Sequence, residues 1–552
     1  MHFLNYKLIG ILHGYLLEGS GSNIWTRSIV RSLCKNGETV HLVCQENHPE
    51  NYDFISEYHC YSNDSVEIKL NREVPYKGRC IIHKPQLGDT LPVYVWDKYE
   101  EFSNVVPMTE LSNAAIEDYV EQNTKVVLKI IQDYKLTALH VNHAVLMSVV
   151  AQRVNKTTSI PFAIMPHGSA IEYAVKRDKR FLDLATDAFD SAKKIFVVSK
   201  EMENRISSIF QTIPNINQKM TYLNLGVDTS IFKPIPPESR HQNIEELFQK
   251  LKDLPRGKND EQSNDLRKNL SSALQLKELG KKISSTTDYQ MKYPDVDVEA
   301  KLEKIDWTHD KVILFVGRLI TSKGIQSVIA TLPLIFHQHP NARLIIVGHG
   351  PSREIMEIFL WALENNEREL VKKIISWGKS LEGNSDDKSS FEDILSFFNQ
   401  LEKNNELDSY YEKAHKHLRS DKVIFTGYLG HEELRYLYPC CDVAIFPSVV
   451  MEAGPLVFLE ALASGCFPLG TYFGGMAVNI DSISDRLPKE ISDLMKISIE
   501  NDRKQFDIVK KINDSLLLDG KYRFVLSKTA KELYDWSSVG EKISSELYSM
   551  NQ

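Results

Sequence analysis

The sequence predicts an α/β fold with two doubly wound domains that face a cleft and carry helical insertions. Two observations support this fold class. Short apolar runs alternate with amphipathic helical patterns in the first third of the chain, and the same alternation starts again near Lys311. Alternating strands and helices are typical of a parallel sheet covered by helices on both faces. A chain of 552 residues has room for about two to four domains.

The first domain is expected over residues 1–235. NIWTRSIVRSLCKNG predicts a helix, because Trp25, Ile29 and Leu33 fall on one face and Gly37 follows as a stop signal. The strands around it are short apolar runs of the length that a buried strand needs. These runs are KLIGIL, TVHLVC, ALHVNH, FAIMPHG and KIFVVS.

The second domain is expected over residues 311–534, and residues 535–552 are expected to form a terminal helix that crosses back to the first domain. Its predicted strands are VILFVGRL, RLIIVGHG, VIFTGYL and DVAIFPS, separated by helical patterns such as GIQSVIATLPLIFHQHP. Two polar segments, residues 236–310 and 361–420, interrupt this order and contain helical patterns of their own. Solvated helical decoration, oligomer contacts and a lid all fit their composition, so their role and the oligomeric state stay open.

The composition argues against several classes of protein. The formal net charge of −8 argues against a nucleic-acid partner or an anionic membrane, which need a broadly basic surface. The seven cysteines show no CxxC spacing, so a reducing cytoplasm is the simplest compartment. The N-terminus lacks the basic region of a signal peptide, and no stretch reaches the roughly 18 to 20 apolar residues of a membrane span. We therefore expect a cytoplasmic protein with at most peripheral membrane contact.

Candidate binding segments follow the predicted strands, because open parallel sheets bind ligands at the carboxyl ends of their strands. LEGSGSN follows the first strand and opens a helix. Gly19 and Gly21 let the backbone approach a ligand, and the helix N-terminus at Ser22 offers unpaired N–H groups to an anion. A plain glycine–serine turn is the alternative.

Two further strand ends have candidate binding groups. In VGRLITSKG, Gly317 ends a strand, and Arg318 and Lys323 are two cations that could hold a diphosphate. Such cations stabilise a leaving diphosphate as a metal ion does elsewhere. In MPHGSAIEY, His167 ends another strand and is followed by Gly168. Two surface cations and a structural histidine are the alternatives.

The segment VVMEAGPLVFLEALASG places two acids beside an apolar helix start. Pro455 suits the first residue of a helix, so Leu456 and Val457 are expected to present unpaired backbone N–H groups to a phosphate. Carboxylates accept hydrogen bonds from hydroxyls. Glu452 and Glu460 are therefore expected to hold sugar and ribose hydroxyls at two depths of one elongated ligand. Ordinary helix-start charge is the alternative.

Together with PHG, LNLGVDTSIFKP, VGHGP and FTGYL, these motifs have the order of the retaining glycosyltransferase family 4, which the chain resembles over roughly residues 1–235 and 310–552. The GRL-x-x-x-KG motif followed by two glutamates in an E-x7-E spacing is the most specific part of this resemblance. The resemblance implies the GT-B fold, with two Rossmann-like domains. The two insertions match no part of the family pattern.

The resemblance also implies a role for each motif residue. Arg318 and Lys323 bind the donor diphosphate, Glu452 the sugar hydroxyls and Glu460 the ribose. His167 lies beside the donor sugar, Gly21 at the phosphates, and the backbone of Tyr428 and Leu429 at the nucleobase. The expected catalytic residues are His167, Arg318, Lys323 and Glu452. Gly454 and Pro455 replace the phenylalanine–glycine pair of many members, which leaves the phosphate contacts to Leu456 and Val457.

The expected reaction transfers a hexosyl group from a UDP-, GDP- or ADP-sugar to a hydroxyl acceptor and retains the anomeric configuration. The resemblance further implies that the leaving phosphate helps to deprotonate the acceptor, so that catalysis rests on positioning and on stabilising the phosphate charge. Neither a cofactor nor a metal is expected. A small soluble acceptor is favoured, while the identities of donor and acceptor stay open. Two alternatives remain. One is a sugar phosphorylase or nucleotide-sugar epimerase of the same fold, and the other is a catalytically silent scaffold subunit that binds nucleotide sugars.

Overall fold

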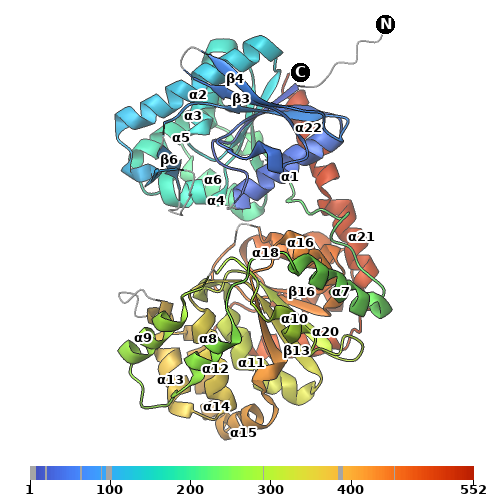
Figure 1. Ribbon diagram of the computed structural model, residues 1–552. Helices are drawn as coiled ribbons and strands as arrows, with labels where there is room; N and C mark the ends of the chain where they lie inside the picture. The colour runs from blue at the N-terminus through green and yellow to red at the C-terminus, as the bar shows by residue number, and fades with distance from the viewer. Residues whose placement is uncertain are drawn as a thin grey trace. The chain divides into compact units, whose positions relative to one another are not determined.

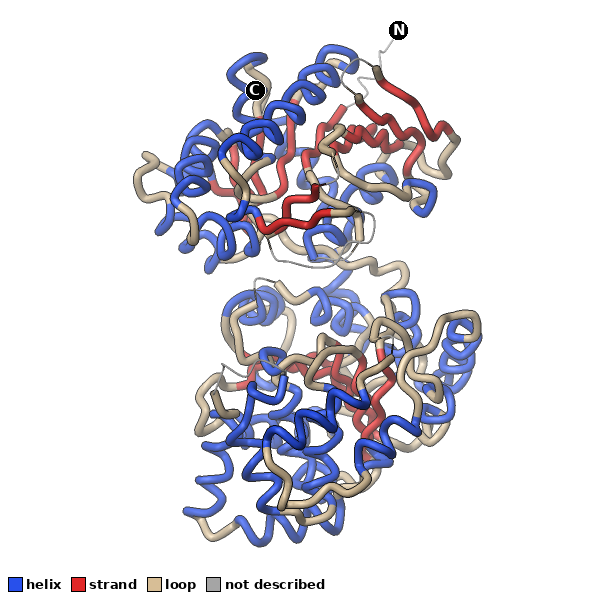
Figure 2. Tube along the Cα trace, turned by 60° about the vertical axis from the view of Figure 1, so that its left-hand side comes forward, coloured by secondary structure: helices blue, strands red, loops and turns tan. Residues whose placement is uncertain are grey.

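The computed structural model describes residues 8–18, 21–62, 65–88, 90–94, 102–289, 291–382, 389–452 and 454–551 of the chain. The chain forms two compact units. Unit 1 comprises Met1–Gly226 and Leu533–Gln552, and unit 2 comprises Val227–Glu532. Each unit has a mainly parallel sheet covered by helices, as Figure 1 and Figure 2 show. The predicted fold class, with two doubly wound α/β domains, is confirmed.

The main sheet of unit 1 has nine strands in the order β11-β10-β9-β8-β1-β2-β5-β3-β4. Neighbouring strands run parallel except for the hairpin of β3 and β4 at one edge. A separate parallel pair is formed by β6 and β7. The strands are β1 (Leu8–Leu12), β2 (Thr39–Val43), β3 (Ile55–Tyr61), β4 (Val66–Asn71), β5 (Arg79–Lys84), β6 (Thr90–Val93), β7 (Asn104–Pro107), β8 (Ala138–Asn142), β9 (Phe162–Met165), β10 (Lys194–Val197) and β11 (Met220–Tyr222).

The helices of unit 1 complete its core. Helix α1 buries Trp25, Ile29 and Leu33, as the amphipathic pattern predicts. The last helix of the chain, α22, packs against α1, and Val539 and Ile543 join the same hydrophobic cluster. The helices are α1 (Gly21–Lys35), α2 (Asn113–Tyr134), α3 (Met147–Thr158), α4 (Gly168–Ala170), α5 (Lys179–Ser191), α6 (Lys200–Ile209) and α22 (Trp536–Ser549).

The sheet of unit 2 has six parallel strands in the order β14-β13-β12-β15-β16-β17. The first strand, β12, is central: the chain adds β13 and β14 on one side of it and returns to add β15, β16 and β17 on the other. The point where the strand order reverses therefore lies between β12 and β15. The strands are β12 (Lys311–Val316), β13 (Ala342–Val347), β14 (Val423–Gly427), β15 (Val443–Phe446), β16 (Phe467–Thr471) and β17 (Lys496–Ile497).

Both polar insertions are integral parts of unit 2. From the segment 236–310, α7 packs on α16, α8 on α12, and α10 on β14. From the segment 361–420, α15 packs on α11 and α14 on α20. The helices of unit 2 are α7 (Arg240–Leu251), α8 (Asp260–Arg267), α9 (Leu276–Thr286), α10 (Val298–Leu302), α11 (Ile325–Gln338), α12 (Arg353–Glu364), α13 (Arg368–Trp377), α14 (Glu392–Lys403), α15 (Leu407–His417), α16 (His431–Leu437), α17 (Leu456–Ala463), α18 (Gly474–Ser484), α19 (Lys489–Leu494), α20 (Lys504–Leu516) and α21 (Arg523–Tyr534).

Candidate functional site

The loops that follow β12 and β15 meet at the point where the strand order of unit 2 reverses. Lys323 Nζ donates to Glu452 Oε2 at 2.6 Å. The backbones are joined as well, because Val449 N and Ser448 Oγ both donate to the carbonyl oxygen of Ser322, at 2.9 and 3.0 Å. Open α/β sheets bind their ligands at such reversal points. Two motifs 129 residues apart in the chain thus form one candidate site.

The Lys323–Glu452 ion pair is held in place but remains accessible, with side chains 30% and 20% exposed. Gly324 fixes the direction of the loop: its φ is +78°, and a Cβ there would lie 2.0 Å from the carbonyl oxygen of Pro447. Only glycine fits such a position. Both side chains could bind a ligand in place of each other. The Lys323 ammonium would then bind a phosphate, and the Glu452 carboxylate would accept from a hydroxyl.

Arg318 lies at the same strand end as Lys323, two residues beyond β12. Its side chain is exposed, and no other residue in the described part of the chain hydrogen-bonds or ion-pairs with it. Gly317 N donates to the carbonyl oxygen of Val347 at 3.1 Å, so the loop leaves the sheet in register with β13. The guanidinium is thus available for bidentate binding of an oxyanion.

The helix after Glu452 begins one residue later than predicted. Pro455 has extended backbone angles (φ −78°, ψ 106°) and is the N-cap residue, so α17 starts at Leu456. The prediction of Pro455 as the first helical residue is therefore wrong, because the N-cap residue is non-helical. Leu456 and Val457 are now the first two helical residues, and their N–H groups have no acceptor inside the helix.

Glu460 is almost fully buried in α17. Its Oε1 lies 2.8 Å from His431 Nδ1, while its Oε2 has no hydrogen-bond partner among the described residues. Burial, followed by the proximity of Glu460, raises the pKa of Tyr438 well above its usual value. The sequence analysis missed His431. Its signal was its place at the start of the helix that follows FTGYL.

The segment predicted to meet a nucleobase begins at the end of β14. Tyr428 is exposed, whereas Leu429 is buried. The Tyr428 ring makes an edge contact with His349, with ring centroids 5.4 Å apart. Gly348 N donates to the carbonyl oxygen of Gly427 at 2.9 Å, which joins the loops after β13 and β14.

In unit 1 the loop after β1 contains three predicted residues. Gly19 lies outside the described residues. Gly21 and Ser22 open α1, where Thr26 Oγ1 donates to the carbonyl oxygen of Ser22 at 2.8 Å. A Cβ added at Gly21 would meet no described atom within 4 Å. Packing within the described part of unit 1 therefore does not require a glycine there.

His167 follows β9 and lies close to the ends of β1 and β8. Its Nε2 is 3.0 Å from Asn142 Oδ1, and its ring centroid is 4.9 Å from that of His143. Burial, and then the nearby His13 and His140, lower the pKa of His167 to about 3. His167 is therefore a neutral hydrogen-bonding group at pH 7 and not a cation.

The sequence analysis missed the side chains that surround His167. His143 has a φ of +74° and is buried, and neither of its ring nitrogens has a hydrogen-bond partner in the described part of the chain. The buried His13 follows β1, and Asn142 links it to Thr26. The available signal was the VNH motif at a strand end, which is equivalent in position to the MPH motif of His167.

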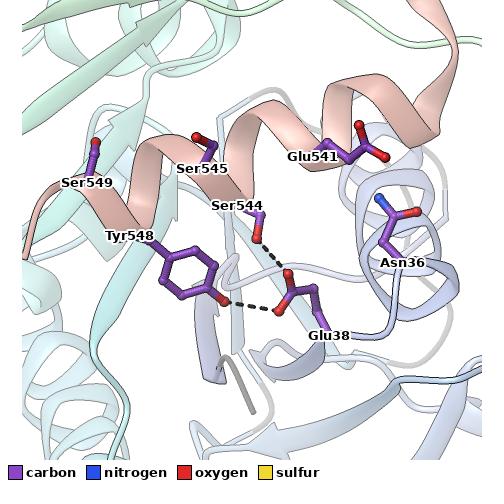
Figure 3. A pocket seen from close by; sticks show the side chains of 7 residues that line it. All are labelled: Asn36, Glu38, Glu541, Ser544, Ser545, Tyr548 and Ser549. Carbon is purple, nitrogen blue, oxygen red and sulfur yellow. Dashed lines mark hydrogen bonds between the residues drawn. The ribbon is translucent and has the colours of Figure 1, made fainter. Parts of the chain in front are cut away.

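A separate hollow of about 570 Å³ lies in unit 1 between α22 and the end of α1 (Figure 3). Ser544 Oγ and Tyr548 Oη donate to the two carboxylate oxygens of Glu38 at 2.7 and 3.0 Å. Its lining is polar: Asn36, Glu38, Glu541, Ser544, Ser545, Tyr548 and Ser549. Because α1 runs back from the carboxyl end of β1, this hollow lies at the opposite edge of the sheet from the loop of Gly21. No predicted site residue lines it.

Two general features of the described residues bear on ligands. They include no group of three or more His, Cys, Asp or Glu side chains placed to hold a metal ion. None of the helices among them combines the length and the apolar character that crossing a bilayer requires.

Comparisons with known proteins were made for the sequence and for the fold. The family model described as "Glycosyl transferases group 1" matches residues 297–377 and 403–531, less than half of the chain. An uncharacterized glycosyltransferase of Methanocaldococcus jannaschii is 24% identical over 237 residues, which cover 42% of this chain and 43% of that protein. The match therefore spans less than half the length of this relative.

Solved structures match over nearly the full chain. The catalytic domain of Starch Synthase IV from Arabidopsis thaliana, bound to ADP and acarbose, has a TM-score of 0.53 at 11% identity, with 99% of each chain covered. Sucrose-phosphate synthase from Thermosynechococcus elongatus has a TM-score of 0.50 at 15% identity, with 98% of each chain covered. The chain thus has the GT-B fold, and its unit 2 is similar in sequence to the glycosyl transferases group 1.

Proposed function

We propose that the protein is a retaining hexosyltransferase of the glycosyltransferase family 4 type, which moves a hexosyl group from a nucleotide-diphosphate sugar to a hydroxyl acceptor. The observation that supports this most is the Lys323–Glu452 pair at the reversal point of the unit 2 sheet. A cation for phosphate and a carboxylate for hydroxyls stand side by side there, as a sugar diphosphate requires. The two residues also lie within the stretches that match the glycosyl transferases group 1.

In the proposed reaction, the bond between the anomeric carbon and the diphosphate oxygen breaks while the acceptor oxygen bonds to the same face of the sugar. The acceptor proton passes to the departing phosphate oxygen, so the transfer needs no metal or cofactor. Arg318 and Lys323 stabilise the negative charge that develops on the diphosphate. The N–H groups of Leu456 and Val457 add two fixed donors to it.

The remaining predicted residues orient the donor. Glu452 accepts hydrogen bonds from the sugar hydroxyls, and the neutral His167 adds a hydrogen bond near the transferred sugar. Glu460 holds the ribose through the carboxylate oxygen that His431 does not occupy. The backbone of Tyr428 and Leu429 contacts the base, which leaves UDP-, GDP- and ADP-sugars as candidate donors. The Gly21–Ser22 turn provides backbone close to the phosphates.

We further propose a small soluble acceptor and a reducing, cytoplasmic location. The seven cysteines form no disulfide, which agrees with such a compartment. A fold neighbour is bound to ADP and acarbose, which is consistent with a nucleotide-containing donor and leaves the base for this chain open.

The decisive experiment compares a panel of UDP-, GDP- and ADP-sugars, measuring nucleotide release and thermal shift. One nucleotide series should stabilise the protein and be hydrolysed slowly without acceptor. Lys323→Met and Glu452→Gln should lower kcat by about 100-fold or more, because they remove charge stabilisation or sugar binding at the reacting centre. Lys372→Met, an exposed lysine of unit 2, is the matched control and should keep full activity.

Three results would contradict the proposal. Full activity of Glu452→Gln would show that the site is wrongly assigned. Sugar transfer that depends on inorganic phosphate would indicate a phosphorylase, and a folded protein that binds nucleotide sugars without turnover would indicate a scaffold subunit. Retention itself is checked by NMR of the anomeric proton in the first product.

A further inference from the structure

Two segments of unit 2 lie outside the stretches that match the glycosyl transferases group 1. They are residues 227–296 and 378–402, which include most of the first polar insertion and the middle of the second. Each segment places one carboxylate against a loop at the carboxyl end of the unit 2 sheet. These carboxylates belong to Asp295 and Glu382.

The first insertion adds a short strand-like segment beside the end of β14. Asp295 N donates to the carbonyl oxygen of Thr426 at 2.8 Å, and Tyr428 N donates to that of Tyr293 at 3.1 Å. The turn at Gly427 closely fits this segment. Its φ is +74°, and a Cβ there would lie 2.7 Å from Asp295 N. The backbone of Tyr428 thus leaves the sheet in a direction that the insertion sets.

The Asp295 side chain fastens this segment to the rest of unit 2. The carboxylate is 1% exposed and accepts from Arg353 Nη2 at 2.8 Å and Lys301 Nζ at 2.7 Å. Arg353 in turn stacks on Phe425 of β14, with its guanidinium carbon 4.6 Å from the ring centroid. Asp295 therefore connects the turn after β14 with the start of α12.

Arg353 is also part of a buried network of ion pairs. Arg353 Nε donates to Glu357 Oε1 at 2.7 Å, and Lys258 Nζ donates to Glu354 and Glu357 at 2.9 and 3.0 Å. The four side chains are at most 3% exposed. Buried charges of this kind persist only in a well-fixed geometry. The anchor of Asp295 is thus rigid.

The second insertion fastens two other loops with one carboxylate oxygen. Glu382 Oε1 accepts from Thr321 N and Thr321 Oγ1, both at 2.6 Å, and from Ser352 Oγ. Thr321 lies between Arg318 and Lys323 in the loop after β12. Ser352 follows β13 and is the N-cap residue of α12. Glu382 therefore joins the loop of the two cations to the loop after β13.

We propose that the two insertions position the nucleotide-sugar loops, with Asp295 setting the base-binding turn and Glu382 setting the diphosphate-binding loop. This inference rests on the proposed function, because it assumes that those loops bind a nucleotide. A loop that is ordered before binding does not pay its ordering entropy when the ligand arrives, so the ligand binds more tightly. Asp295 and Glu382 are positioning residues and do not touch the donor.

The test compares two variants with two matched controls. Asp295→Asn is matched by Asp310→Asn, a buried aspartate that also accepts from an arginine, Arg343 Nε at 2.8 Å. Asp310 lies at the amino ends of β12 and β13, on the opposite edge of the same sheet. Both aspartates are buried, so both variants lose a buried charge. A difference in nucleotide affinity between them then reports the position of the aspartate in the sheet.

Glu382→Gln is matched by Glu364→Gln. Glu364 is also partly buried and accepts from a backbone N–H, that of Ser420 at 3.2 Å. It ends α12, whereas Ser352 precedes the start of that helix. The Glu382 carboxylate accepts three hydrogen bonds and that of Glu364 accepts one, so Tm is measured beside affinity to separate the loss of stability from the loss of binding. Only Glu382 lies at the carboxyl end of the strands, where the proposed binding loops are.

The measurements are Tm and the dissociation constants of UDP, GDP and ADP by calorimetry, followed by donor KM and kcat where turnover is found. Asp295→Asn and Glu382→Gln should weaken nucleotide binding about tenfold, because small displacements of binding groups are costly. The controls should also lower Tm, but they should change the dissociation constants less than twofold. Where Asp295→Asn fails to fold, the milder Lys301→Gln and Ser352→Ala replace the two variants, with the same expected direction.

The outcomes distinguish failure of the positioning role from failure of the proposed function. Equal affinity in variants and wild type, or equal losses in variants and controls, would overturn the inference and leave the proposed function standing. A wild-type protein that binds none of the three nucleotides would overturn the proposed function, and the inference with it.

Discussion

The buried polar side chains of the two units differ in their charge. Unit 1 buries neutral imidazoles, and in the described part of unit 2 no histidine is buried. Burial lowers the pKa of His13 and His140 to about 4 and that of His41 to about 3. Burial also lowers the pKa of His83 and of His143 well below the usual value of a histidine. Glu46, which accepts from Leu17 N at 2.9 Å, is a buried charge of unit 1.

Unit 2 buries charges that compensate one another. Lys258, Arg353, Glu354 and Glu357 form a network in which every member faces an opposite charge. Burial alone would raise the pKa of Glu357, but Arg353 and Lys258 hold it well below its usual range. A neutral imidazole needs no counter-ion but resists protonation, whereas a buried charge depends on its partners. Unit 1 should therefore be sensitive to acid, and unit 2 to the loss of a single partner.

The largest expected effect is acid unfolding of unit 1 before unit 2. Above pH 6.5 the histidines are neutral in both the folded and the unfolded chain, so their contribution does not change. Below pH 6.5 these histidines become protonated in the unfolded chain. In the folded unit they stay neutral until the pH approaches their lowered pKa values of about 3 to 4. From pH 6.5 to 5, each such histidine therefore removes about 1.6 kcal/mol from the free energy of unfolding.

Hydrogen exchange measured segment by segment at pH 7.5 and pH 5 checks this order, after correction for the intrinsic exchange rates. Protection in β1, β2 and β8 should fall steeply, while protection in β12 and β13 should hold. The Glu357 carboxyl, with a lowered pKa, loses its contribution only below pH 4.5, so it does not act in this range. Simultaneous loss of protection in both units would contradict the comparison.

The second effect is the loss of a partner in unit 2. Lys258→Met leaves Glu354 and Glu357 buried with one cation fewer, which should cost about 3–5 kcal/mol at pH 7. Calorimetric Tm measures the loss. The matched control is Lys372→Met, whose ion pair with Glu369 is more than 60% exposed on both sides and contributes at most about 1 kcal/mol. Equal Tm values for the two variants would remove the distinction between buried and surface charge.

Much of this architecture could be predicted from local sequence. Strands buried on both faces are continuous apolar runs, so the parallel sheets and the loops that follow them are visible in the sequence. The motif residues Arg318, Lys323 and Glu452 could be assigned to strand ends for the same reason. The helix start at Pro455 was misplaced by one residue, which is a common error because propensities do not fix element boundaries.

Other features depend on contacts that local patterns do not encode. The pairing of His431 with Glu460 joins two helices, and the bonds of Glu382 to Thr321 span 61 residues. Solvated helical decoration was one of the alternatives for the two polar insertions, and lysine and glutamate are seldom buried. Lys258 of the first insertion is nevertheless only 1% exposed, and its charge is compensated by Glu354 and Glu357 only after folding.

The smallest expected effect isolates one histidine of unit 1. His140 stacks between Trp25 and Phe196, with ring centroids 5.4 and 5.7 Å away, and its Nδ1 has no hydrogen-bond partner among the described residues. His140→Phe should keep this packing at pH 7.5 and remove one group that takes up a proton on unfolding. Between pH 6.5 and 4, the pH dependence of the free energy of unfolding should become shallower by up to about 1.4 kcal/mol per pH unit.

Urea unfolding followed at several pH values measures this slope for unit 1. Tyr119→Phe is the control, because it changes another buried aromatic ring of unit 1 without removing a histidine. It should leave the slope between pH 6.5 and 4 unchanged. The same slope in His140→Phe and in the wild type would mean that the acid sensitivity of unit 1 comes from groups other than its buried imidazoles. The contrast between a unit that buries neutral rings and one that buries compensated charges would then rest on unit 2 alone.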